Sequence, residues 1–474
     1  MIMRKLYLSL IALVLSLAAV ANTPVFNIRD FGAVGDGVNI DSPAFNKAII
    51  AASQAGGGVV LVPEGTYLCF SIRLKSNILI RFEEGSVVKA APVGELGAYD
   101  APEPNPWDKY QDFGHSHWQN SLFWGIGIEN FGVEGPGLID GTAVLSRGVS
   151  KVGVEGPANK AFGLKNCKNV SFKDVTFLNS GHFSLLLTGV DNLLIDNVTA
   201  DTNRDAFDID CCENVEIRNC RVNTLNDDAI VLKCSYGLGW AKPCQNVLIE
   251  DCEVSGYDIG SYLSGEKTTN VTHAPDRDGP TGRVKLGTES NGGFRNIEIR
   301  NIRFNHCRGL ALESVDGACL ENIKVSGLVM DDINNSPIYI RLGDRMRGPE
   351  DLPSSIVRNI EISDVKVTNC DSRYALLIVG LEGHPVENVL LKDISIQYRG
   401  GLTKEDVKLQ RGGNDFFGRL GAYPEPASHG IQPAWGLSVS YARNIVLDNV
   451  KMELMNPDQR PKIYKHKVKK LVWK

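Results

Sequence analysis

The sequence predicts an all-β solenoid, a parallel β-helix with a short N-terminal capping helix. The main observation is a repeated motif, in which an asparagine is followed by an apolar residue and by further apolar residues at +3 and usually +6. The motif begins at Asn130, Asn169, Asn192, Asn214, Asn246, Asn296, Asn322, Asn359, Asn388 and Asn444. Its shortest spacings are 22 and 23 residues, and the alternation within each copy is typical of a β-strand.

A repeat of this length that is built from short strands indicates a solenoid. Leucine-rich repeats are excluded, because the LxxLxLxxN pattern is missing and no helix follows each strand. In a parallel β-helix the apolar residues of each coil face the interior. We expect the repeated asparagines to stack at a turn and to form a hydrogen-bonded ladder.

The N-terminus reads as a secretory signal peptide over residues 1–21. Arg4 and Lys5 precede an apolar run that ends in the small residues Ala19-Val20-Ala21. No later stretch approaches the ~20 apolar residues that cross a bilayer. We therefore expect a secreted or periplasmic protein with no membrane association after cleavage, and a single β-helix domain over residues 22–474.

Residues 22–70 are expected to form the N-terminal cap of the solenoid. Asp41 or Ser42 begins a short helix with Pro43 in its first turn. The apolar stripe of this helix is Phe45, Ala48, Ile49 and Ala52. Gly56 to Gly58 end it, and two strands follow around Pro63-Glu64-Gly65. Such a helix covers a sheet edge that would otherwise pair with another chain.

Charge and cysteine content narrow the possible partners. The formal net charge is −6, and removal of Arg4 and Lys5 makes it more negative, which disfavours nucleic acid binding. Cys234 and Cys244 can close a short disulfide loop in an exported protein. Cys167, Cys220, Cys252 and Cys307 fall in repeat positions that favour buried thiols. No CxxC pair or His-Cys cluster suggests a metal site, so we expect no metal and no cofactor, and we expect a monomer.

Aromatic residues and a basic tail lie outside the repeats. Trp107, Trp118 and Trp124 form a Trp-rich segment before the first long spacing. Aromatic side chains beside a solenoid groove either stack on sugar rings or anchor their own loop, and the sequence leaves both open. The tail Lys462–Lys470 is expected to be a solvated terminal strand.

The candidate site lies between Thr202 and Lys233. Asp205 follows Asn192 by 13 residues, and Asp227 follows Asn214 by the same number. If each asparagine begins a coil, the two aspartates occupy the same place on successive coils, with strands about 4.8 Å apart. Asp228 then lies alongside them, which makes three clustered carboxylates.

Clustered carboxylates suit acid–base chemistry. Mutual repulsion raises at least one pKa, so one group can protonate a leaving oxygen while an ionised neighbour activates water. An inverting glycosidase separates the two groups by roughly 6.5–9.5 Å, which a diagonal pair of Asp205 with Asp227 or Asp228 can reach. The alternatives are a ladder of turn aspartates or a calcium site.

The chain resembles glycoside hydrolase family 28, the polygalacturonase family. The resemblance rests on the Phe31-Gly-Ala-Val-Gly-Asp-Gly cap, the asparagine repeats, Asp205 and Asn226-Asp227-Asp228. It implies a right-handed parallel β-helix. It also implies that Asp227 is the general acid, that Asp205 and Asp228 activate water, and that hydrolysis proceeds with inversion.

The family's motifs are only partly present. Asn203-Arg204-Asp205 stands in place of Asn-Thr-Asp, while Gly-His-Gly and Arg-Ile-Lys are absent. In the family, those basic residues hold the galacturonate carboxylate at the cleavage subsite. Lys285 can restore a positive charge; otherwise Glu313 points to a neutral sugar such as rhamnose. The substrate-binding candidates are His182, Asn203, Arg204, Lys233 and Lys285.

Three functions remain open from the sequence. The first is an exported hydrolase of pectic poly- or oligosaccharide, exo-acting if the long insertions close one end of the groove. The second is a polysaccharide lyase on the same fold, with calcium held by clustered aspartates. The third is a non-catalytic carbohydrate-binding β-helix.

Overall fold

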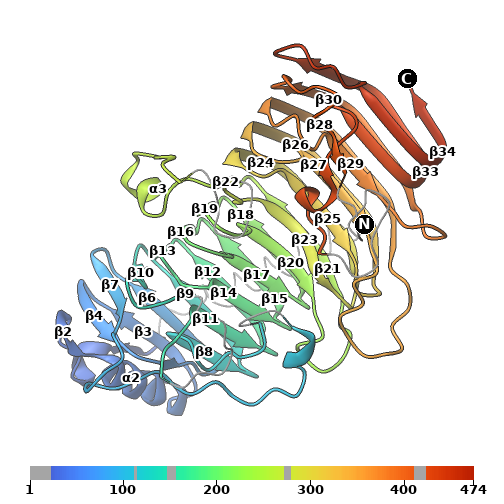
Figure 1. The fold of residues 1–474 in the computed structure, drawn as a ribbon. Helices are drawn as coiled ribbons and strands as arrows, with labels where there is room; N and C mark the ends of the chain where they lie inside the picture. The colour runs from blue at the N-terminus through green and yellow to red at the C-terminus, as the bar shows by residue number, and fades with distance from the viewer. Residues whose placement is uncertain (1–22, 112–114, 147–155, 272–278, 410–422) are drawn as a thin grey trace. The chain divides into compact units, whose positions relative to one another are not determined.

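The structure is a computed structural model of the chain, and it describes residues 23–111, 115–146, 156–271, 279–409 and 423–474 (Figure 1). The expected signal peptide, residues 1–21, lies outside the described residues. The chain divides into two compact units, Met1–Arg221 and Val222–Lys474. The first unit is described before the second.

In the first unit, strands of consecutive coils pair in parallel and form three stacks. The first stack contains β1 (Val25–Asn27), β3 (Gly58–Val62), β6 (Ile78–Phe82), β9 (Glu129–Glu134), β12 (Lys168–Lys173), β15 (Asp191–Asp196) and β18 (Glu213–Arg218). The second contains β2 (Asp36–Ile40), β4 (Gly65–Cys69), β7 (Ser86–Ala90), β10 (Leu138–Asp140), β13 (Thr176–Leu178) and β16 (Thr199–Thr202). The third contains β5 (Ile72–Arg73), β8 (Phe123–Ile126), β11 (Lys160–Lys165), β14 (Phe183–Thr188) and β17 (Phe207–Asp210).

In the second unit, one series contains longer strands, and β24 continues past the bend to pair with both β21 and β22 (Figure 1). This series contains β21 (Cys244–Glu250), β22 (Glu253–Ser255), β24 (Phe294–Cys307), β26 (Cys319–Ile333), β28 (Ile356–Cys370), β30 (Val386–Tyr398), β33 (Leu437–Leu454) and β34 (Ile463–Trp473). The other contains β20 (Ile230–Cys234), β23 (Val284–Ser290), β25 (Leu310–Ser314), β27 (Ile338–Leu342) and β29 (Leu376–Val379), and it ends on β33. The remaining short elements are β19 (Arg221–Thr224), α3 (Ser261–Ser264), and the antiparallel pair β31 (Lys408–Leu409) and β32 (Gly430–Ile431), with η3 (Pro426–His429) before β32.

The parallel pairing in each unit confirms the predicted fold class, a right-handed parallel β-helix. The asparagine ladder is confirmed as well. In the first unit Asn192 Nδ2 donates to Asn169 Oδ1 at 2.9 Å, and Asn214 Nδ2 donates to Asn192 Oδ1 at 3.1 Å. In the second unit Asn388 Nδ2 donates to Asn359 Oδ1 at 3.1 Å. These residues have positive φ, near 55°, a conformation that asparagine tolerates better than other side chains.

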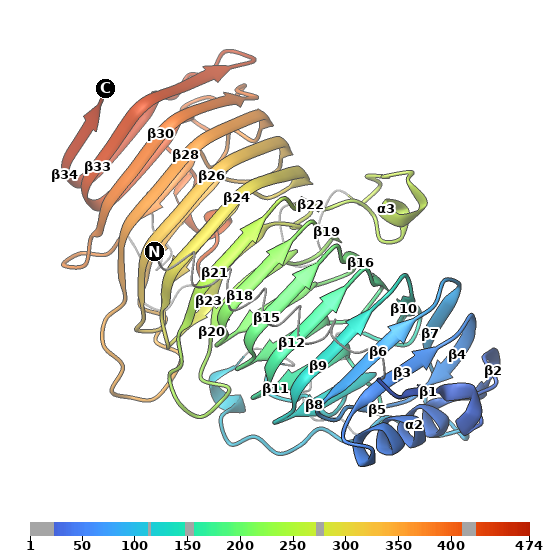
Figure 2. The same ribbon diagram turned by 180° about the vertical axis from the view of Figure 1, so that it is seen from behind.

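The capping helix is α2, Ser42–Gln54, at the N-terminal end of the first unit, where Figure 2 shows it beside β1, β3 and β5. The four expected apolar residues of this helix are buried. Asp41 is the N-cap residue, but its side chain makes no cap hydrogen bond. Its carboxylate instead accepts hydrogen bonds from the backbone of Val34 at 2.6 Å and Gly35 at 3.1 Å. Asp41 therefore ties the helix start to the preceding turn.

The expected disulfide between Cys234 and Cys244 is wrong, because both residues are free and buried. Cys234 Sγ accepts a hydrogen bond from Gly293 N at 3.1 Å, so its sulfur belongs to the packed interior of the coil. The four cysteines predicted as buried thiols are also free and buried. The basic tail forms β34, which pairs with β33 and has no buried side chain, as predicted for a solvated strand. Within the described residues, no helix is long and apolar enough to cross a membrane.

Candidate active site

In the first unit, Asp205 lies in the turn between β16 and β17. Its side chain is buried, and His115 Nε2 lies 3.9 Å from Asp205 Oδ2. The same nitrogen lies 3.0 Å from Oδ2 of Asp208, which is fully buried in β17. The His115 imidazole is therefore hydrogen-bonded to Asp208, which fixes its direction, and it lies within ion-pair distance of Asp205. The carboxylate and imidazole atoms lie within 4.8 Å of one another, close enough to ligate a divalent cation.

His182 joins the same cluster. The His182 ring stacks on Phe183 at 4.1 Å between centroids, and its edge faces the His115 ring at 5.6 Å. His182 is 2% exposed, so its ring is packed inside this cluster. Arg204 is buried and Asn203 is half-buried in the Asp205 turn. The structure thus brings His182, Asn203 and Arg204 close to Asp205 along one side of the first unit.

The loop that carries His115 is fixed to the outer face of the third stack. Trp118 is completely buried and packs on Phe183 and Leu186. Its Nε1 donates to Thr188 Oγ1 at 3.2 Å. A Cβ on Gly163 would approach Trp118 O to 2.5 Å, so glycine is needed where the loop crosses β11. Trp118 is therefore a loop anchor.

In the second unit, Asp227 and Asp228 lie in the turn between β19 and β20. Thr224 Oγ1 donates to Asp227 O at 2.6 Å, and Gly282 N donates to the same oxygen at 3.0 Å. Asp228 N donates to Asp227 Oδ1 at 3.1 Å. Asp227 is half-buried and Asp228 is buried. The turn backbone is thus held from both sides of the aspartate pair.

A buried network of charges surrounds Asp228. Arg283 Nε donates to Asp228 Oδ1 at 2.7 Å, while the other end of the guanidinium is held by Glu425, with Nη1 at 3.2 Å from Oε2. Arg308 Nη1 lies 3.4 Å from the same Glu425 oxygen. Burial alone would raise the pKa of Glu425, but Arg283 and Arg308 outweigh burial and lower it. Bidentate pairing of this kind fixes orientation as well as charge.

Lys285 lies on the other side of Asp228. Its Nζ is 3.7 Å from Asp228 Oδ2, 3.4 Å from Glu313 Oε2, and 2.9 Å from Thr288 Oγ1, to which it donates. Burial opposes the charged form of Lys285, but Glu313, Tyr423 and Asp228 together outweigh burial and raise the lysine pKa. Full burial also raises the pKa of Glu313, against the opposing effect of Lys285. The Lys285 ammonium lies 5.4 Å from the centre of the Tyr423 ring.

Lys233 points to a different cluster of the second unit. Its Nζ is 3.7 Å from Glu289 Oε2, and Arg345 and Arg347 reach Oε1 of the same carboxylate at 3.7 and 3.6 Å. Arg345 also pairs with Asp316 at 2.5 Å. Lys233 is thus one of three cations around a buried glutamate, and it is 5% exposed.

Sequence reasoning missed His115 and Glu425. His115 precedes Asp208 by 93 residues, and Glu425 follows Arg283 by 142 residues. Both lie in long insertions, where no repeat fixes the register. The only signal for His115 was its place among histidines and tryptophans in His115-Ser-His-Trp118. Glu425 offered no signal beyond Tyr423-Pro-Glu-Pro.

Two family models match parts of this chain. The family described as "Glycosyl hydrolases family 28" matches residues 110–274, and "Rhamnogalacturonase A/epimerase, pectate lyase-like" matches residues 25–177. A probable polygalacturonase from Vitis vinifera is 22% identical over 80% of this chain and 75% of its own length. A probable polygalacturonase from Arabidopsis thaliana is 25% identical over 78% of this chain and 73% of its own length.

Solved structures support the same fold. An exopolygalacturonase from Thermotoga maritima has a TM-score of 0.61 and 24% identity, with 83% of this chain and 91% of that chain covered. A family 28 exopolygalacturonase from Yersinia enterocolitica has a TM-score of 0.66 and 15% identity, with 95% and 78% covered. The chain is therefore similar to the glycosyl hydrolases of family 28 over residues 110–274, and its relatives over most of its length are probable polygalacturonases.

Proposed function

We propose that this protein is an exported, inverting glycoside hydrolase of pectic polysaccharide. Asp205, Asp227 and Asp228 are its catalytic carboxylates. The observation that supports this assignment is the common place of these aspartates in the coil. The turn with Asp205 precedes β17, and the turn with Asp227 and Asp228 precedes β20. Asp205 and Asp227 each follow a ladder asparagine by 13 residues. Those two asparagines, Asn192 and Asn214, are hydrogen-bonded neighbours.

The assigned roles follow from this placement and from the family. Asp227 protonates the leaving glycosidic oxygen, while Asp205 and Asp228 orient and activate the attacking water. His115 supports this division because it holds the Asp205 side from one direction. Arg283 holds the Asp228 carboxylate from another. When the water attacks the anomeric carbon from the face opposite the leaving group, the product has inverted anomeric configuration.

The charge balance around Asp228 favours a neutral sugar at the cleavage subsite. Three carboxylates face three cations, namely Asp228, Glu313 and Glu425 against Arg283, Lys285 and Arg308. Lys285 is committed to Glu313 and Asp228, so above about pH 7, where Glu313 is ionised, this group offers no surplus positive charge to a uronate carboxylate. We therefore propose that the cleavage subsite takes a neutral sugar, such as rhamnose at the end of a rhamnogalacturonan chain.

Exo-action is proposed from the first unit. The segment around His115 and Trp118 is anchored on β11 and β14, which are the strands that precede β17 in the third stack. A segment fixed across these strands blocks the groove on the N-terminal side of Asp205. A polysaccharide chain would then enter with one end only. The solved neighbours from Thermotoga maritima and Yersinia enterocolitica are both named exopolygalacturonases.

The remaining expectations stand as part of the proposal. A signal peptide at residues 1–21 directs export to the periplasm or the exterior, and residues 22–474 form one β-helix domain whose cap spans residues 22–70. His182, Asn203, Arg204, Lys233 and Lys285 support substrate binding. The protein acts as a monomer without a cofactor.

The test is product analysis on polygalacturonate and on rhamnogalacturonan oligosaccharides, with Asp227→Asn as the control. We expect release of a neutral monosaccharide from rhamnogalacturonan oligosaccharides and no activity in the variant. Galacturonate release from polygalacturonate would contradict the neutral subsite, and a ladder of oligomers would contradict exo-action. Unsaturated, UV-absorbing products that disappear with chelator would favour a lyase. Unchanged properties in Asp227→Asn would leave only a binding role.

A further inference from the structure

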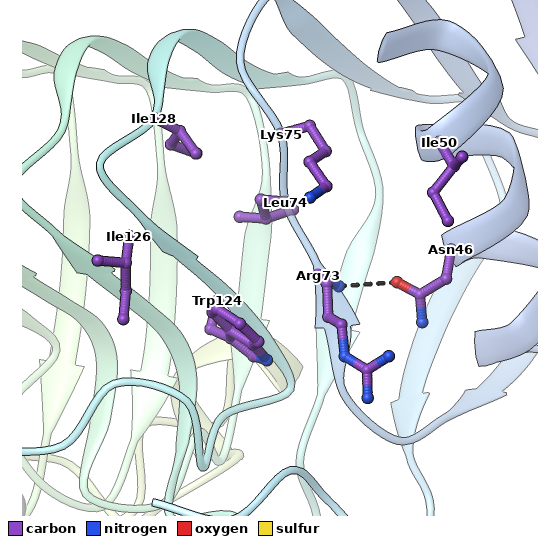
Figure 3. Close-up of a pocket in the computed structure, with 8 residues that line it drawn as sticks. All are labelled: Asn46, Ile50, Arg73, Leu74, Lys75, Trp124, Ile126 and Ile128. Atoms are coloured by element: carbon purple, nitrogen blue, oxygen red, sulfur yellow. Dashed lines mark hydrogen bonds between the residues drawn. The ribbon is translucent and has the colours of Figure 1, made fainter. Parts of the chain in front are cut away.

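A cavity of about 370 Å³ lies at the N-terminal end of the first unit, between α2 and the strands β5 and β8 (Figure 3). It is lined by Asn46, Ile50, Arg73, Leu74, Lys75, Trp124, Ile126 and Ile128. Its volume falls in the range of small-molecule sites. None of the proposed catalytic residues lines it, and no part of the proposed reaction uses it.

Trp124 is held in a fixed orientation at this cavity. Its indole Nε1 donates to Asp100 Oδ2 at 2.7 Å. Asp100 in turn accepts from Arg73 Nε at 2.8 Å and Nη2 at 2.6 Å. Arg73 N donates to Asn46 Oδ1 at 2.8 Å, which connects the group to α2. A preorganised aromatic side chain loses little conformational entropy when it binds a ligand.

The rest of the cavity combines an apolar floor with exposed apolar walls. Leu74 and Ile128 are 4% and 6% exposed, whereas Ile50 and Ile126 are 47% and 37% exposed. Figure 3 shows Ile50 on α2 and Ile126 on the opposite side of the cavity. A concave apolar surface with a fixed indole suits the apolar face of a sugar ring.

The charge at the rim is positive. Arg73 and Lys75 carry two positive charges, and Asp100 neutralises one of them through Arg73. Lys75 is exposed beside Leu74. The cavity therefore presents one surplus positive charge above an apolar floor, which complements an anionic ligand with an apolar face. A purely apolar protein segment or a second copy of this acidic chain fits this combination less well.

The cavity is separate from the Asp205 cluster, although both lie on the third stack. Trp124 is in register with Gly163, Gly163 with Leu186, and Leu186 with Asp208. Three strand steps of about 4.8 Å put the Trp124 row roughly 14 Å from the Asp208 row. The Trp118 segment crosses the face at Gly163, between these two rows.

We propose that this cavity is a second carbohydrate-binding site, which takes a uronate residue of a pectic chain. The sugar ring packs on Trp124, and its carboxylate lies at Lys75. The choice of a pectic uronate rests on the proposed function, whereas the site itself rests on the cavity. The site holds the polymer on the protein while another part of the chain reaches the carboxylates.

The test measures binding of galacturonate oligosaccharides by calorimetry in the Asp227→Asn background, where turnover is removed. Trp124→Ala should weaken the affinity about tenfold, because a buried tryptophan contact is typically a binding hot spot. Trp124→Phe should keep most of the affinity. Lys75→Ala should weaken it about threefold at low salt and have little effect at high salt. Trp240→Ala and Lys168→Ala, at exposed residues outside the cavity, should change nothing.

Kinetics separate this site from the catalytic one. In the otherwise unchanged protein, Trp124→Ala should raise KM for long pectic chains and leave kcat and the KM for the shortest substrate unchanged. If the protein binds galacturonate oligosaccharides through Trp124 but hydrolyses nothing, the proposed function fails and the site stands. Equal affinity of Trp124→Ala and its parent, with an unchanged unfolding midpoint, would overturn the site. An unchanged affinity of the Ile126→Asp variant would also overturn the site.

Discussion

The two units hold their carboxylates in opposite ways. In the first unit, Asp205 and Asp208 share one histidine, His115, whose charge depends on its protonation. In the second unit, Asp228 is bonded to Arg283 and faces Lys285. The pKa values of Arg283 and Lys285 are raised above their usual range by the carboxylates around them. The same coil geometry thus carries one carboxylate pair beside a histidine, in the first unit, and one carboxylate beside an arginine and a lysine that stay charged, in the second.

This difference teaches how a repeat fold separates scaffold from chemistry. The ladder and the parallel pairing are alike in both units. The electrostatics come from insertions, His115 in one unit and Glu425 in the other. Permanent charges suit a group that must stay in place, and a histidine suits one that responds to its surroundings.

The largest expected effect is from Arg283→Met. It leaves the buried carboxylates of Asp228 and Glu425 without their shared guanidinium, and loss of one buried partner typically costs about 3–5 kcal/mol. We expect a loss of that size in the free energy of unfolding, measured by denaturant titration. Arg358→Met is the matched control, since Arg358 pairs with Glu321 at 2.7 Å but its side chain is 45% exposed. A loss below about 1 kcal/mol is expected there, and equal losses would refute the contrast.

A change of pH should affect the second unit through Glu313. Burial raises the pKa of this carboxyl from 4.5 to about 7, so the folded chain binds its proton more tightly than the unfolded chain. This contribution to stability is present below about pH 4.5 and is lost as the pH rises to about 7. We expect a decrease on the order of 2 kcal/mol across this window. Glu313→Gln should flatten the profile between these limits, and an unchanged slope would contradict the assignment.

His115→Gln tests the first unit. Glutamine keeps a polar group near Asp205 and Asp208 but does not reproduce an imidazole shared between them. Because His115 positions Asp205 rather than reacting itself, we expect kcat to fall by roughly 10–100-fold, less than the roughly 10²–10⁴-fold that a group acting directly as acid or base contributes, with KM nearly unchanged. His384→Gln, at an exposed histidine, should have no effect on either constant. A change in KM alone would assign His115 to substrate binding.

The smallest contrast is expected between the two ladders. Asn192→Ala and Asn359→Ala each place alanine at a positive φ near 55° and remove a ladder hydrogen bond. Each should lower the free energy of unfolding by about 1–2 kcal/mol. The corresponding glycine variants should lose less, because glycine adopts this conformation freely. A large difference between the two positions would show that the ladder does not serve both units equally.

The repeat made much of the fold predictable. A 22- to 23-residue spacing sets the strands in register, and positive φ explains why asparagine recurs at the bend. The capping helix was predicted from its apolar stripe, although the Asp41 carboxylate binds the preceding turn instead of the helix. The Cys234–Cys244 disulfide was wrong because both thiols pack in the interior, which spacing alone does not reveal.

The candidate site was predictable only where it lies on the repeat. Counting from the ladder asparagines singled out Asp205 and Asp227, and the structure puts them in the turns before β17 and β20. Lys285 was one way to restore a positive charge at the cleavage subsite, but it pairs with Glu313 from the adjacent coil. His115 and Glu425 come from insertions with no period. Their contacts depend on loop conformation, which the sequence pattern does not encode.

The most direct test of the central claim is proton NMR of the first product formed from a rhamnogalacturonan oligosaccharide, with the wild-type chain and with Asp227→Asn. The proposal predicts that the wild-type chain first releases a sugar of inverted anomeric configuration and that Asp227→Asn releases none. Retained configuration, or undiminished release by Asp227→Asn, would contradict the assignment of Asp205, Asp227 and Asp228 as the catalytic carboxylates.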